Sequence, residues 1–214
     1  MNKRNSQQNN KHSRGASYRG YSRRKVDVRE LRKRFLIVCE GEETEPNYFR
    51  SFRTPGLVIA VHGIGANPSR LVEKAKELHS QDEYDQIWCV FDRDSWSKQD
   101  FNNAIQNAKV QGFDVAYSNE AFELWYILHF EYLNTGLPRE EYKKKLSKLL
   151  GQEYKKNSET IYDQIKNRQS KAIKNAERLL NEYESPKPSD DNPSTTVHKL
   201  VQQLNQAISN SILL

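Results

Sequence analysis

Short apolar runs alternate with amphipathic segments along the first two thirds of the chain. The runs at residues 35–39 and 87–91 each hold five apolar residues without a charge, which is typical of strands buried on both faces of a parallel sheet. Apolar-rich runs at 57–61 and 113–117 predict two more strands. Helices are predicted between and after them, at 44–53, 69–79, 97–111 and 118–130. This alternation predicts an α/β fold with a mostly parallel central sheet flanked by helices.

The character of the chain changes near Pro138. Lysine-rich segments follow, and their apolar positions recur at helical spacing. Helices are predicted there at 140–150, 159–183 and 197–209. We therefore divide the chain into an α/β core of residues 34–134 and a helical extension of residues 135–214 that packs on the core.

The basic charge of the protein is concentrated at the N-terminus. The chain of 214 residues has a formal net charge of +6, and its first 34 residues hold twelve of the 34 Lys and Arg but only two of the 28 Asp and Glu. Such a polar segment cannot bury enough apolar surface to fold alone, so we predict that residues 1–33 form a disordered basic arm. An arm of this kind adds salt-dependent phosphate contacts with little sequence preference. An unstructured solubilising leader is the alternative.

The apolar runs are too short for membrane-spanning helices. No run approaches the roughly 18 to 20 apolar residues of a membrane span, and the N-terminus is polar rather than signal-like. Both cysteines, Cys39 and Cys89, lie inside strand-like runs, which is typical of small, reduced core residues. We predict a cytoplasmic protein without a membrane partner.

Carboxylates follow two of the predicted strands. Glu40 comes directly after the run at 35–39, and Asp92 and Asp94 come after the run at 87–91. Ligands of open α/β sheets gather beyond the carboxyl ends of the strands, and residues two apart in an extended chain point the same way. The three side chains would therefore face one crevice if the strands are neighbours. Converging carboxylates repel one another unless a cation joins them, and Mg²⁺ or Mn²⁺ is the natural one.

A fourth acid stands out in an apolar segment. Glu123 lies in a stretch whose interior is almost entirely apolar, and burying a carboxylate without a partner costs several kcal/mol. A metal ion or an arginine in the crevice would offset this cost, so Glu123 is a candidate metal ligand. The alternative is a glutamate at the start of a helix that faces solvent.

Four polar residues are candidates for binding substrate or phosphate. Ser194 and Thr195 precede the last predicted helix, where free backbone amides can bind an anion, although helix capping explains them equally well. Arg93 lies between the two aspartates and can neutralise a neighbouring acid or contact a phosphate. Asn119 is at the start of the helix that carries Glu123.

The order of these motifs resembles a known domain and a known family. A strand ending in Glu-Gly, a β-α unit and a strand ending in Asp-x-Asp resemble the Toprim domain of topoisomerases, bacterial primases and OLD-type nucleases. Four segments are more specific, because in this order and at these spacings they resemble the RloB-like family of prokaryotic defence-associated proteins, from about Arg34 to the C-terminus. These segments are VCEGEETEPNYF, VFDRD, SNEAFELWYILHF and NPSTTVHKLV. The chain departs from the family pattern at Asn119-Glu120, where Asn-Pro is expected.

The resemblance implies a Toprim-like core and a metal-dependent nuclease that hydrolyses phosphodiester bonds in RNA, tRNA among them, or in DNA. In the Toprim domain the glutamate does acid-base work and the paired aspartates hold Mg²⁺, which assigns these roles to Glu40 and to Asp92 and Asp94. Glu40 is a candidate metal ligand as well. The resemblance also implies a role in antiviral defence by abortive infection, beside a partner ATPase of the AAA type. An oligomer is compatible with these expectations.

Two other functions fit the same residues. The acids can bind Mg²⁺ and phosphate without turnover, in a module that senses nucleic acid or nucleotides and acts with a partner ATPase. They can also merely cap helices in a subunit that binds a partner protein. Cleavage that is lost on substitution of Asp92, without loss of the fold, would separate the nuclease from both alternatives.

Overall fold

The fold is built on one five-stranded sheet. The computed structural model describes residues 32–94 and 96–212. The strands are β1 (Lys33–Cys39), β2 (Leu57–Gly63), β3 (Gln86–Asp92), β4 (Asp114–Asn119) and β5 (Ser194–Thr195). Their order is β2-β1-β3-β4-β5, in which the first four strands are parallel and β5 runs antiparallel to β4. This confirms the predicted α/β fold with a mostly parallel sheet. The basic arm predicted at residues 1–33 lies, up to residue 31, outside the described residues.

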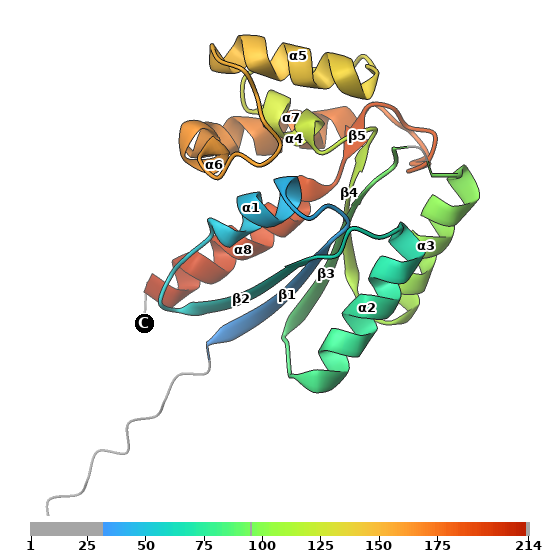
Figure 1. Ribbon diagram of the computed structural model, residues 1–214, viewed down its shortest axis with the longest axis vertical. Helices are drawn as coiled ribbons and strands as arrows, with labels where there is room; N and C mark the ends of the chain where they lie inside the picture. The colour runs from blue at the N-terminus through green and yellow to red at the C-terminus, as the bar shows by residue number, and fades with distance from the viewer. Residues whose placement is uncertain (1–31, 95, 213–214) are drawn as a thin grey trace, which may run out of the picture. The chain divides into compact units, whose positions relative to one another are not determined.

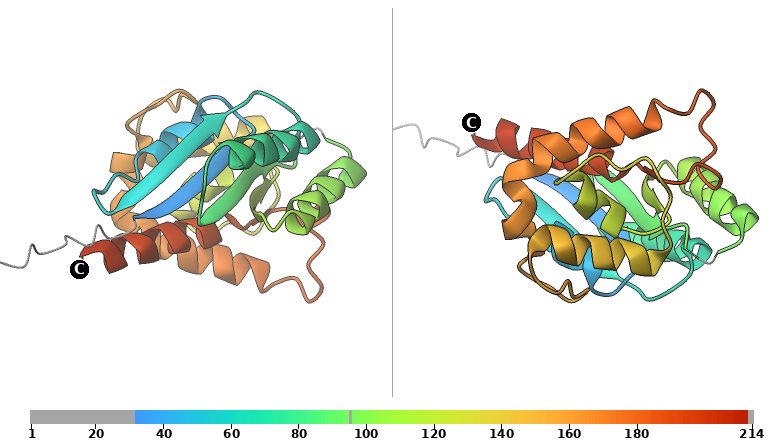
Figure 2. Two further views of the ribbon diagram at one scale, coloured as in Figure 1. Left: turned by 90° about the horizontal axis from the view of Figure 1, so that it is seen from below. Right: turned by 90° about the horizontal axis from the view of Figure 1, so that it is seen from above.

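Helices cover both faces of the sheet and the end at which the parallel strands finish (Figure 1). They are α1 (Thr44–Arg50), α2 (Pro68–Gln81), α3 (Lys98–Val110), α4 (Glu123–Leu128), α5 (Arg139–Leu150), α6 (Ile161–Ile165), α7 (Gln169–Leu180) and α8 (Val197–Ile212), with a 3₁₀ turn η1 at Lys166–Arg168. Helices α2 and α3 cover one face, and α1 and α8 cover the other. Helices α4 to α7 gather beyond the carboxyl ends of the strands (Figures 1 and 2).

The side chains of β1 form the centre of the core on both faces of the sheet. Phe35, Ile37 and Cys39 pack on the side of α1 and α8, whereas Leu36 and Val38 pack on the side of α2 and α3. All five side chains are fully buried, as expected for a central strand of a sheet that is covered on both sides. The position directly after β1 is therefore held by a fully buried central strand.

An aromatic cluster joins α1 to the helical extension. Tyr48 is fully buried, and its ring lies edge-on to Phe122, Trp125 and Tyr162 at centroid distances of 5.9, 6.4 and 5.5 Å. Such edge contacts add about 0.5–1.5 kcal/mol per pair to the burial of apolar area. The extension and the sheet accordingly belong to one compact unit, which begins at Arg32.

Three predicted local structures are wrong in their boundaries. The helix predicted at 118–130 is the end of β4 followed by α4, because Ser118 and Asn119 pair with β5 instead of capping a helix. β5 itself consists of residues that were expected to cap the last helix, so tertiary pairing overrides the local capping pattern. The helix predicted at 159–183 is divided into α6, η1 and α7, and nothing local in the sequence explains this break.

Both cysteines are buried core residues, as predicted. Cys39 and Cys89 are free and buried. Burial raises the pKa of the Cys89 thiol to about 12 and that of Cys39 well above its ordinary value. Neither side chain is therefore a thiolate at neutral pH.

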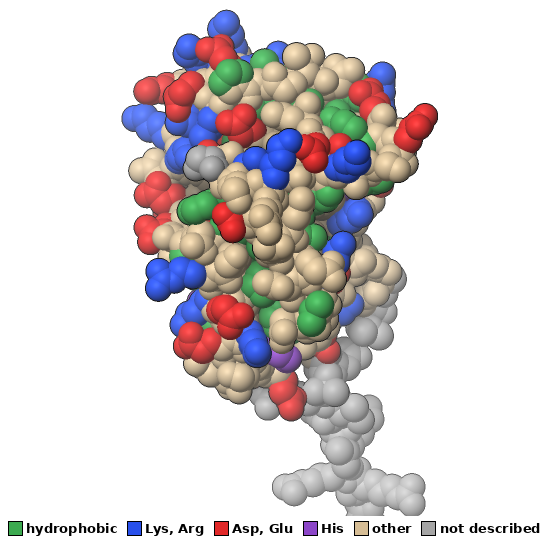
Figure 3. Space-filling model, turned by 90° about the vertical axis from the view of Figure 1, so that its right-hand side faces the viewer, with side chains coloured by type: hydrophobic (Ala, Val, Ile, Leu, Met, Phe, Trp, Pro, Cys, Tyr) green, Lys and Arg blue, Asp and Glu red, His purple; other side chains and the backbone are tan. Residues whose placement is uncertain are grey.

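Charge on the outer surface is mixed in sign. On the face shown in Figure 3, acidic and basic side chains are interspersed and neither sign forms one continuous patch. No helix within residues 32–94 and 96–212 is both long and apolar enough to cross a membrane. Beyond the carboxyl ends of β1 and β3, in contrast, acidic side chains outnumber basic ones.

Candidate functional site

A pocket of about 480 Å³ opens where the carboxyl ends of β1 and β3 meet helices α1, α4 and α5. β1 pairs with β2 on one side and with β3 on the other, so this is the point at which open α/β sheets bind ligands. The pairing of β1 with β3 confirms that the strands carrying the predicted acids are neighbours. The pocket is lined by two cationic side chains, Arg139 and Lys156, and by six carboxylates: Glu40, Glu42, Glu43, Glu45, Asp92 and Glu123.

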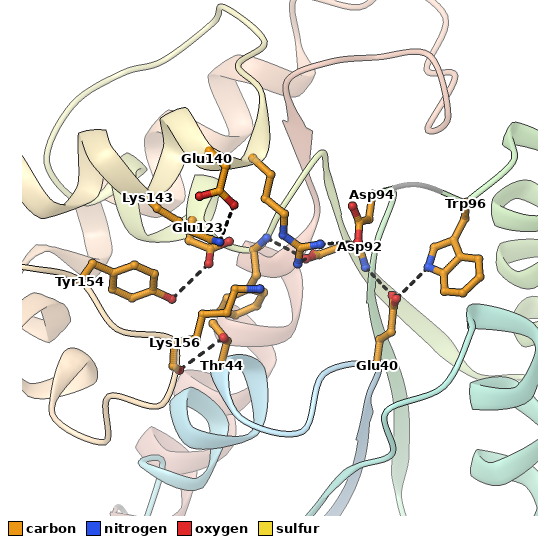
Figure 4. A network of polar contacts seen from close by, with 12 residues as sticks. Glu40, Thr44, Asp92, Asp94, Trp96, Glu123, Glu140, Lys143, Tyr154 and Lys156 are labelled. Carbon is orange, nitrogen blue, oxygen red and sulfur yellow. Dashed lines mark hydrogen bonds and ion pairs between the residues drawn. The ribbon is translucent and has the colours of Figure 1, made fainter.

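Glu40 is held at the edge of the sheet by two hydrogen bonds. Its Oε2 accepts from the main-chain N–H of Asp92 at 3.1 Å, and its Oε1 accepts from Nε1 of Trp96 at 2.7 Å (Figure 4). Burial raises the pKa of the Glu40 carboxyl above its ordinary value, and the two hydrogen bonds offset this only in part. Glu40 is therefore fixed in position and can exchange a proton nearer to neutral pH than an exposed glutamate.

Asp92 ends β3 and is almost completely buried, with 4% of its surface exposed. Its Oδ2 accepts from the main-chain N–H of Phe122 at 3.0 Å and lies 3.6 Å from Nη2 of Arg139. Burial, together with repulsion from neighbouring glutamates of which Glu45 is the strongest, raises the pKa of Asp92 well above its ordinary value. The ionised form of Asp92 therefore needs more positive charge than Arg139 alone supplies.

Arg139 bridges the two aspartates. Its Nη1 forms an ion pair with Asp94 and its Nη2 forms the longer one with Asp92. Arg139 is the first residue of α5, so the helical extension brings a cation to the acids of the sheet. Asp94 has a positive φ of 33°, which aspartate tolerates better than most residues, and its N–H donates to the Glu120 carbonyl at 3.1 Å. This turn places the Asp94 side chain against the guanidinium.

Glu45 lies in α1 and lines the pocket with only 5% of its surface exposed. Burial, and then repulsion from Glu123 and Glu40, raises the pKa of Glu45 to about 7. Gly41 leaves the room that this carboxylate occupies, because a Cβ at residue 41 would collide with Oε2 of Glu45. A side chain at residue 41 would therefore require the Glu45 carboxylate to move.

Glu123 begins α4 and has 1% of its surface exposed, so the alternative of a solvent-facing glutamate is wrong. Its Oε1 accepts from the Tyr154 hydroxyl at 3.3 Å (Figure 4), and Lys156 lines the same pocket. The segment that carries Tyr154 and Lys156 is tied to α1, because Thr44 Oγ1 donates to the Lys156 carbonyl at 3.4 Å. Glu123 is thus a buried carboxylate that accepts its hydrogen bond from the neutral hydroxyl of Tyr154.

The donor set of the pocket fits a divalent cation in its chemistry. Mg²⁺ and Mn²⁺ prefer carboxylate oxygens, and acidic side chains outnumber basic ones around the pocket. The side-chain positions are less favourable: within residues 32–94 and 96–212, no three His, Cys, Asp or Glu converge closely enough to hold a metal ion. Asp92 and Asp94 share Arg139 as their cation instead. A metal ion bound by both aspartates would therefore replace part of an existing ion pair.

The four residues predicted to bind substrate or phosphate do not line the pocket. Arg93, Asn119, Ser194 and Thr195 instead donate hydrogen bonds to main-chain carbonyls, those of residues 94 and 96, 188, 191 and 117 respectively. Ser194 and Thr195 are fully buried in β5, which they join to β4. In this arrangement the four side chains hold loops and the sheet edge together, and their role in binding phosphate stays a prediction.

Sequence patterns missed four residues around the pocket. Trp96, Arg139, Tyr154 and Lys156 reach the acids from loops or from the start of a helix. The only local signal is the position of Trp96, which follows the Asp-x-Asp motif closely. The other three are brought in by the folding of the extension onto the sheet.

A family model matches most of the chain. This model is described as RloB-like protein, and it matches residues 35–204. The matched range includes all the acids that line the pocket, and also Arg139 and Lys156. No curated protein and no solved structure matches the chain.

Proposed function

The chain belongs to the RloB-like family, and from this premise we propose that it is a metal-dependent nuclease that hydrolyses phosphodiester bonds in RNA or DNA. The observation that carries the proposal is the acidic pocket at the junction of β1 and β3, where Glu40 meets the backbone of Asp92. From the family resemblance we propose tRNA as one substrate, a role in antiviral abortive infection in the cytoplasm, and a partner ATPase of the AAA type.

Buried carboxylates are the proposed ligands of Mg²⁺ or Mn²⁺. Asp92, Asp94 and Glu123 would hold one or two ions, and Glu40 is a further candidate ligand. Such an ion polarises a phosphoryl oxygen and lowers the pKa of an attacking water. The burial of Asp92 and Glu123 supports this assignment, because a bound cation offsets the desolvation of a buried carboxylate.

Glu40 is the proposed proton acceptor. Hydrogen bonds to both of its oxygens fix the direction of the carboxylate. Burial raises its pKa, which brings it closer to the pH at which a carboxylate can take a proton from water and later return it. Trp96 is then a positioning residue, since it acts through Glu40.

Positive charge for the substrate comes from the helical extension. Arg139 and Lys156 are the cations of the pocket, and both follow residue 134. A phosphate group that enters beside the acids could pair with these two side chains. The basic arm predicted at residues 1–33 would add contacts to the rest of a nucleic acid without reading its sequence.

A cleavage assay on the purified protein tests the proposal. Total tRNA, single-stranded DNA and duplex DNA are incubated with Mg²⁺, Mn²⁺ or EDTA. We expect cleavage only with a divalent ion, and a loss of about 10²- to 10⁴-fold in Glu40→Gln, with a comparable loss in Asp94→Asn. Asp114→Asn is the matched control, because Asp114 begins β4 at the opposite end of the sheet. Failure of the wild type to cut any of these substrates with metal would contradict the proposal.

A sensing module is the second candidate, and the position of Arg139 favours it. The guanidinium already neutralises part of the charge on Asp92 and Asp94, and a pocket of about 480 Å³ can take a nucleotide. Such a module binds nucleic acid or nucleotide but never cuts. Binding without cleavage in the same assay would therefore select this candidate.

A further inference from the structure

We propose that Arg139 has two successive partners. Without metal its guanidinium binds Asp92 and Asp94, and once a divalent cation displaces it, the same guanidinium binds the phosphate that is to be cut. This inference rests on the proposed nuclease function and adds to it a substrate-binding residue from the helical extension. It describes an exchange of ion pairs in which no covalent bond is formed or broken.

The guanidinium of Arg139 is only partly satisfied by its present contacts. Nη1 and Nη2 face the two aspartates, whereas Nε is buried and has no hydrogen-bond partner among the described residues. The side chain as a whole keeps 28% of its surface exposed and lines the pocket. A buried donor without an acceptor is unfavourable, so another acceptor that enters the pocket would satisfy the arginine better.

The two aspartates depend on Arg139 to different extents. Asp92 keeps the N–H of Phe122 as a donor at 3.0 Å when the guanidinium leaves. The Asp94 carboxylate has no donor other than Arg139 in the part of the chain that the structure describes. Departure of the guanidinium therefore frees Asp94 for a new cation, while Asp92 stays oriented.

A phosphodiester needs the freed guanidinium because the pocket is acidic. Six carboxylates line it against two cations, Arg139 and Lys156, and while Arg139 stays on the aspartates only Lys156 is left to offset their repulsion of a phosphate. A guanidinium presents parallel N–H donors that match two phosphate oxygens as well as they match a carboxylate. A metal ion on the aspartates thus supplies charge to the acids and at the same time releases Arg139 to supply charge to the substrate.

The test compares Arg139→Gln and Arg139→Lys with the wild type in the full-length protein. Lys144→Gln is the matched control, because Lys144 is exposed on the same helix and pairs with Glu141. Binding of Mn²⁺ alone is measured by electron paramagnetic resonance. Binding of fluorescein-labelled RNA and DNA oligonucleotides of one sequence is measured by anisotropy in Mn²⁺ and in EDTA, with Glu40→Gln added to every chain to prevent cutting.

Arg139→Gln is expected to change Mn²⁺ binding and oligonucleotide binding in opposite directions. Arg139→Gln should bind Mn²⁺ about three- to tenfold more tightly, because the ion no longer has to displace a guanidinium, and should bind oligonucleotide about tenfold more weakly in Mn²⁺. In EDTA its oligonucleotide binding should match that of the parent, since there the arginine stays on the aspartates. Arg139→Lys should fall between the two, and Lys144→Gln should match the parent in Mn²⁺ affinity.

Three results would overturn the inference. Unchanged or weaker Mn²⁺ binding by Arg139→Gln would show that the guanidinium and the ion do not compete. Unchanged oligonucleotide binding in Mn²⁺ would show that Arg139 does not hold phosphate. No Mn²⁺ binding by the wild type would remove the exchange altogether.

If Arg139→Gln does not fold, the same comparisons are made with Arg139→Lys, which keeps the charge. A wild type that binds Mn²⁺ but cuts nothing refutes the nuclease alone, and the Mn²⁺ and oligonucleotide measurements still decide the exchange.

Discussion

Carboxylates in the two halves of the pocket have different hydrogen-bond and ion-pair partners. In the half formed by the sheet, Glu40 and Asp92 accept hydrogen bonds from main-chain N–H groups, and the adjacent Asp94, which does not itself line the pocket, pairs with Arg139. In the half formed by helices, Glu45 lies buried between other acids and Glu123 accepts from a tyrosine hydroxyl at 3.3 Å (Figure 4). All five carboxylates belong to one small region, yet only the sheet half holds its acids with strong donors.

Burial does not account for this difference. Asp92 and Glu123 are both almost fully buried, with 4% and 1% of their surfaces exposed. The sheet half differs because the main-chain N–H groups of Asp92, in β3, and of Phe122, just before α4, donate to its carboxylates, which orients them and favours their charged form. Substitutions of Glu40 and Asp92 should therefore act on activity, whereas substitution of Glu45 should act mainly on stability and its dependence on pH.

Among the variants that compare the two halves of the pocket, the largest effect is expected from Asp92→Asn. The amide keeps an oxygen that can accept from the Phe122 N–H but loses the charge, so we expect cleavage to fall about 10²- to 10³-fold. Burial raises the pKa of Asp92, so the ionised side chain destabilises the folded protein above the pKa of the unfolded chain. The variant should therefore unfold at a higher temperature than the wild type at pH 8 and lose this advantage at pH 4. A variant that is inactive and less stable at both values would mean that Asp92 is there to hold the fold.

The sheet half is also the half that the sequence predicts. Uncharged five-residue runs are a local pattern, and parallel neighbours end at the same edge, so the acids after 35–39 and 87–91 are expected to meet. β5 has no such pattern, because Ser194 and Thr195 form a strand only through pairing with β4.

The helix half could be predicted only in part. Glu123 stands out because it is an acid in an apolar segment. Glu45 looks like an ordinary acid at a helix start, and nothing local in the sequence shows that its carboxylate is buried next to Gly41. Arg139 reaches the pocket because α5 packs on α4, and the segment of Lys156 is held against α1 by Thr44. Contacts of this kind between distant segments leave no spacing in the sequence.

The next effect in size is expected from Glu45→Gln. Because the pKa of Glu45 is raised to about 7, the folded protein binds more protons than the unfolded chain between about pH 4.5 and 7, and stability falls as the pH rises through this window. Glutamine has no charge to bury. We expect wild-type stability to fall by at most roughly 3 kcal/mol from this group between pH 5 and pH 8, and the fall to be smaller in the variant, as measured by denaturant unfolding.

Glu43→Gln serves as the control for this measurement. Glu43 lines the same pocket two residues earlier but is exposed, so its substitution should leave the dependence of stability on pH unchanged. Cleavage by Glu45→Gln should stay within a few-fold of the wild type. A loss of activity as large as that of Asp92→Asn would remove the distinction between the two halves.

A smaller effect on activity is expected from Trp96→Phe. Phenylalanine keeps an aromatic side chain at this position, but the hydrogen bond from Trp96 Nε1 to Glu40 Oε1 at 2.7 Å is lost. This bond lowers the pKa of Glu40, so its removal should move the acidic limb of the pH–rate profile to higher pH and slow cleavage at neutral pH by about tenfold. Trp88→Phe is the control, because its Nε1 donates to Gln86 within β3. A profile that does not move would show that Glu40 is not the group that titrates.

The smallest effect is expected from Tyr154→Phe. The lost hydrogen bond to Glu123 is long, at 3.3 Å, so we expect a cost of about 1 kcal/mol or less and a fall in melting temperature of about 2–4 °C. Tyr183→Phe is matched to it, because it removes a hydroxyl that donates to the Pro193 carbonyl at 2.9 Å. If Glu123 takes part in binding metal, added Mn²⁺ should reduce the deficit of Tyr154→Phe and leave that of Tyr183→Phe as it was. An equal response of both variants would mean that no ion reaches Glu123, and the helix half would then support the sheet half only by packing.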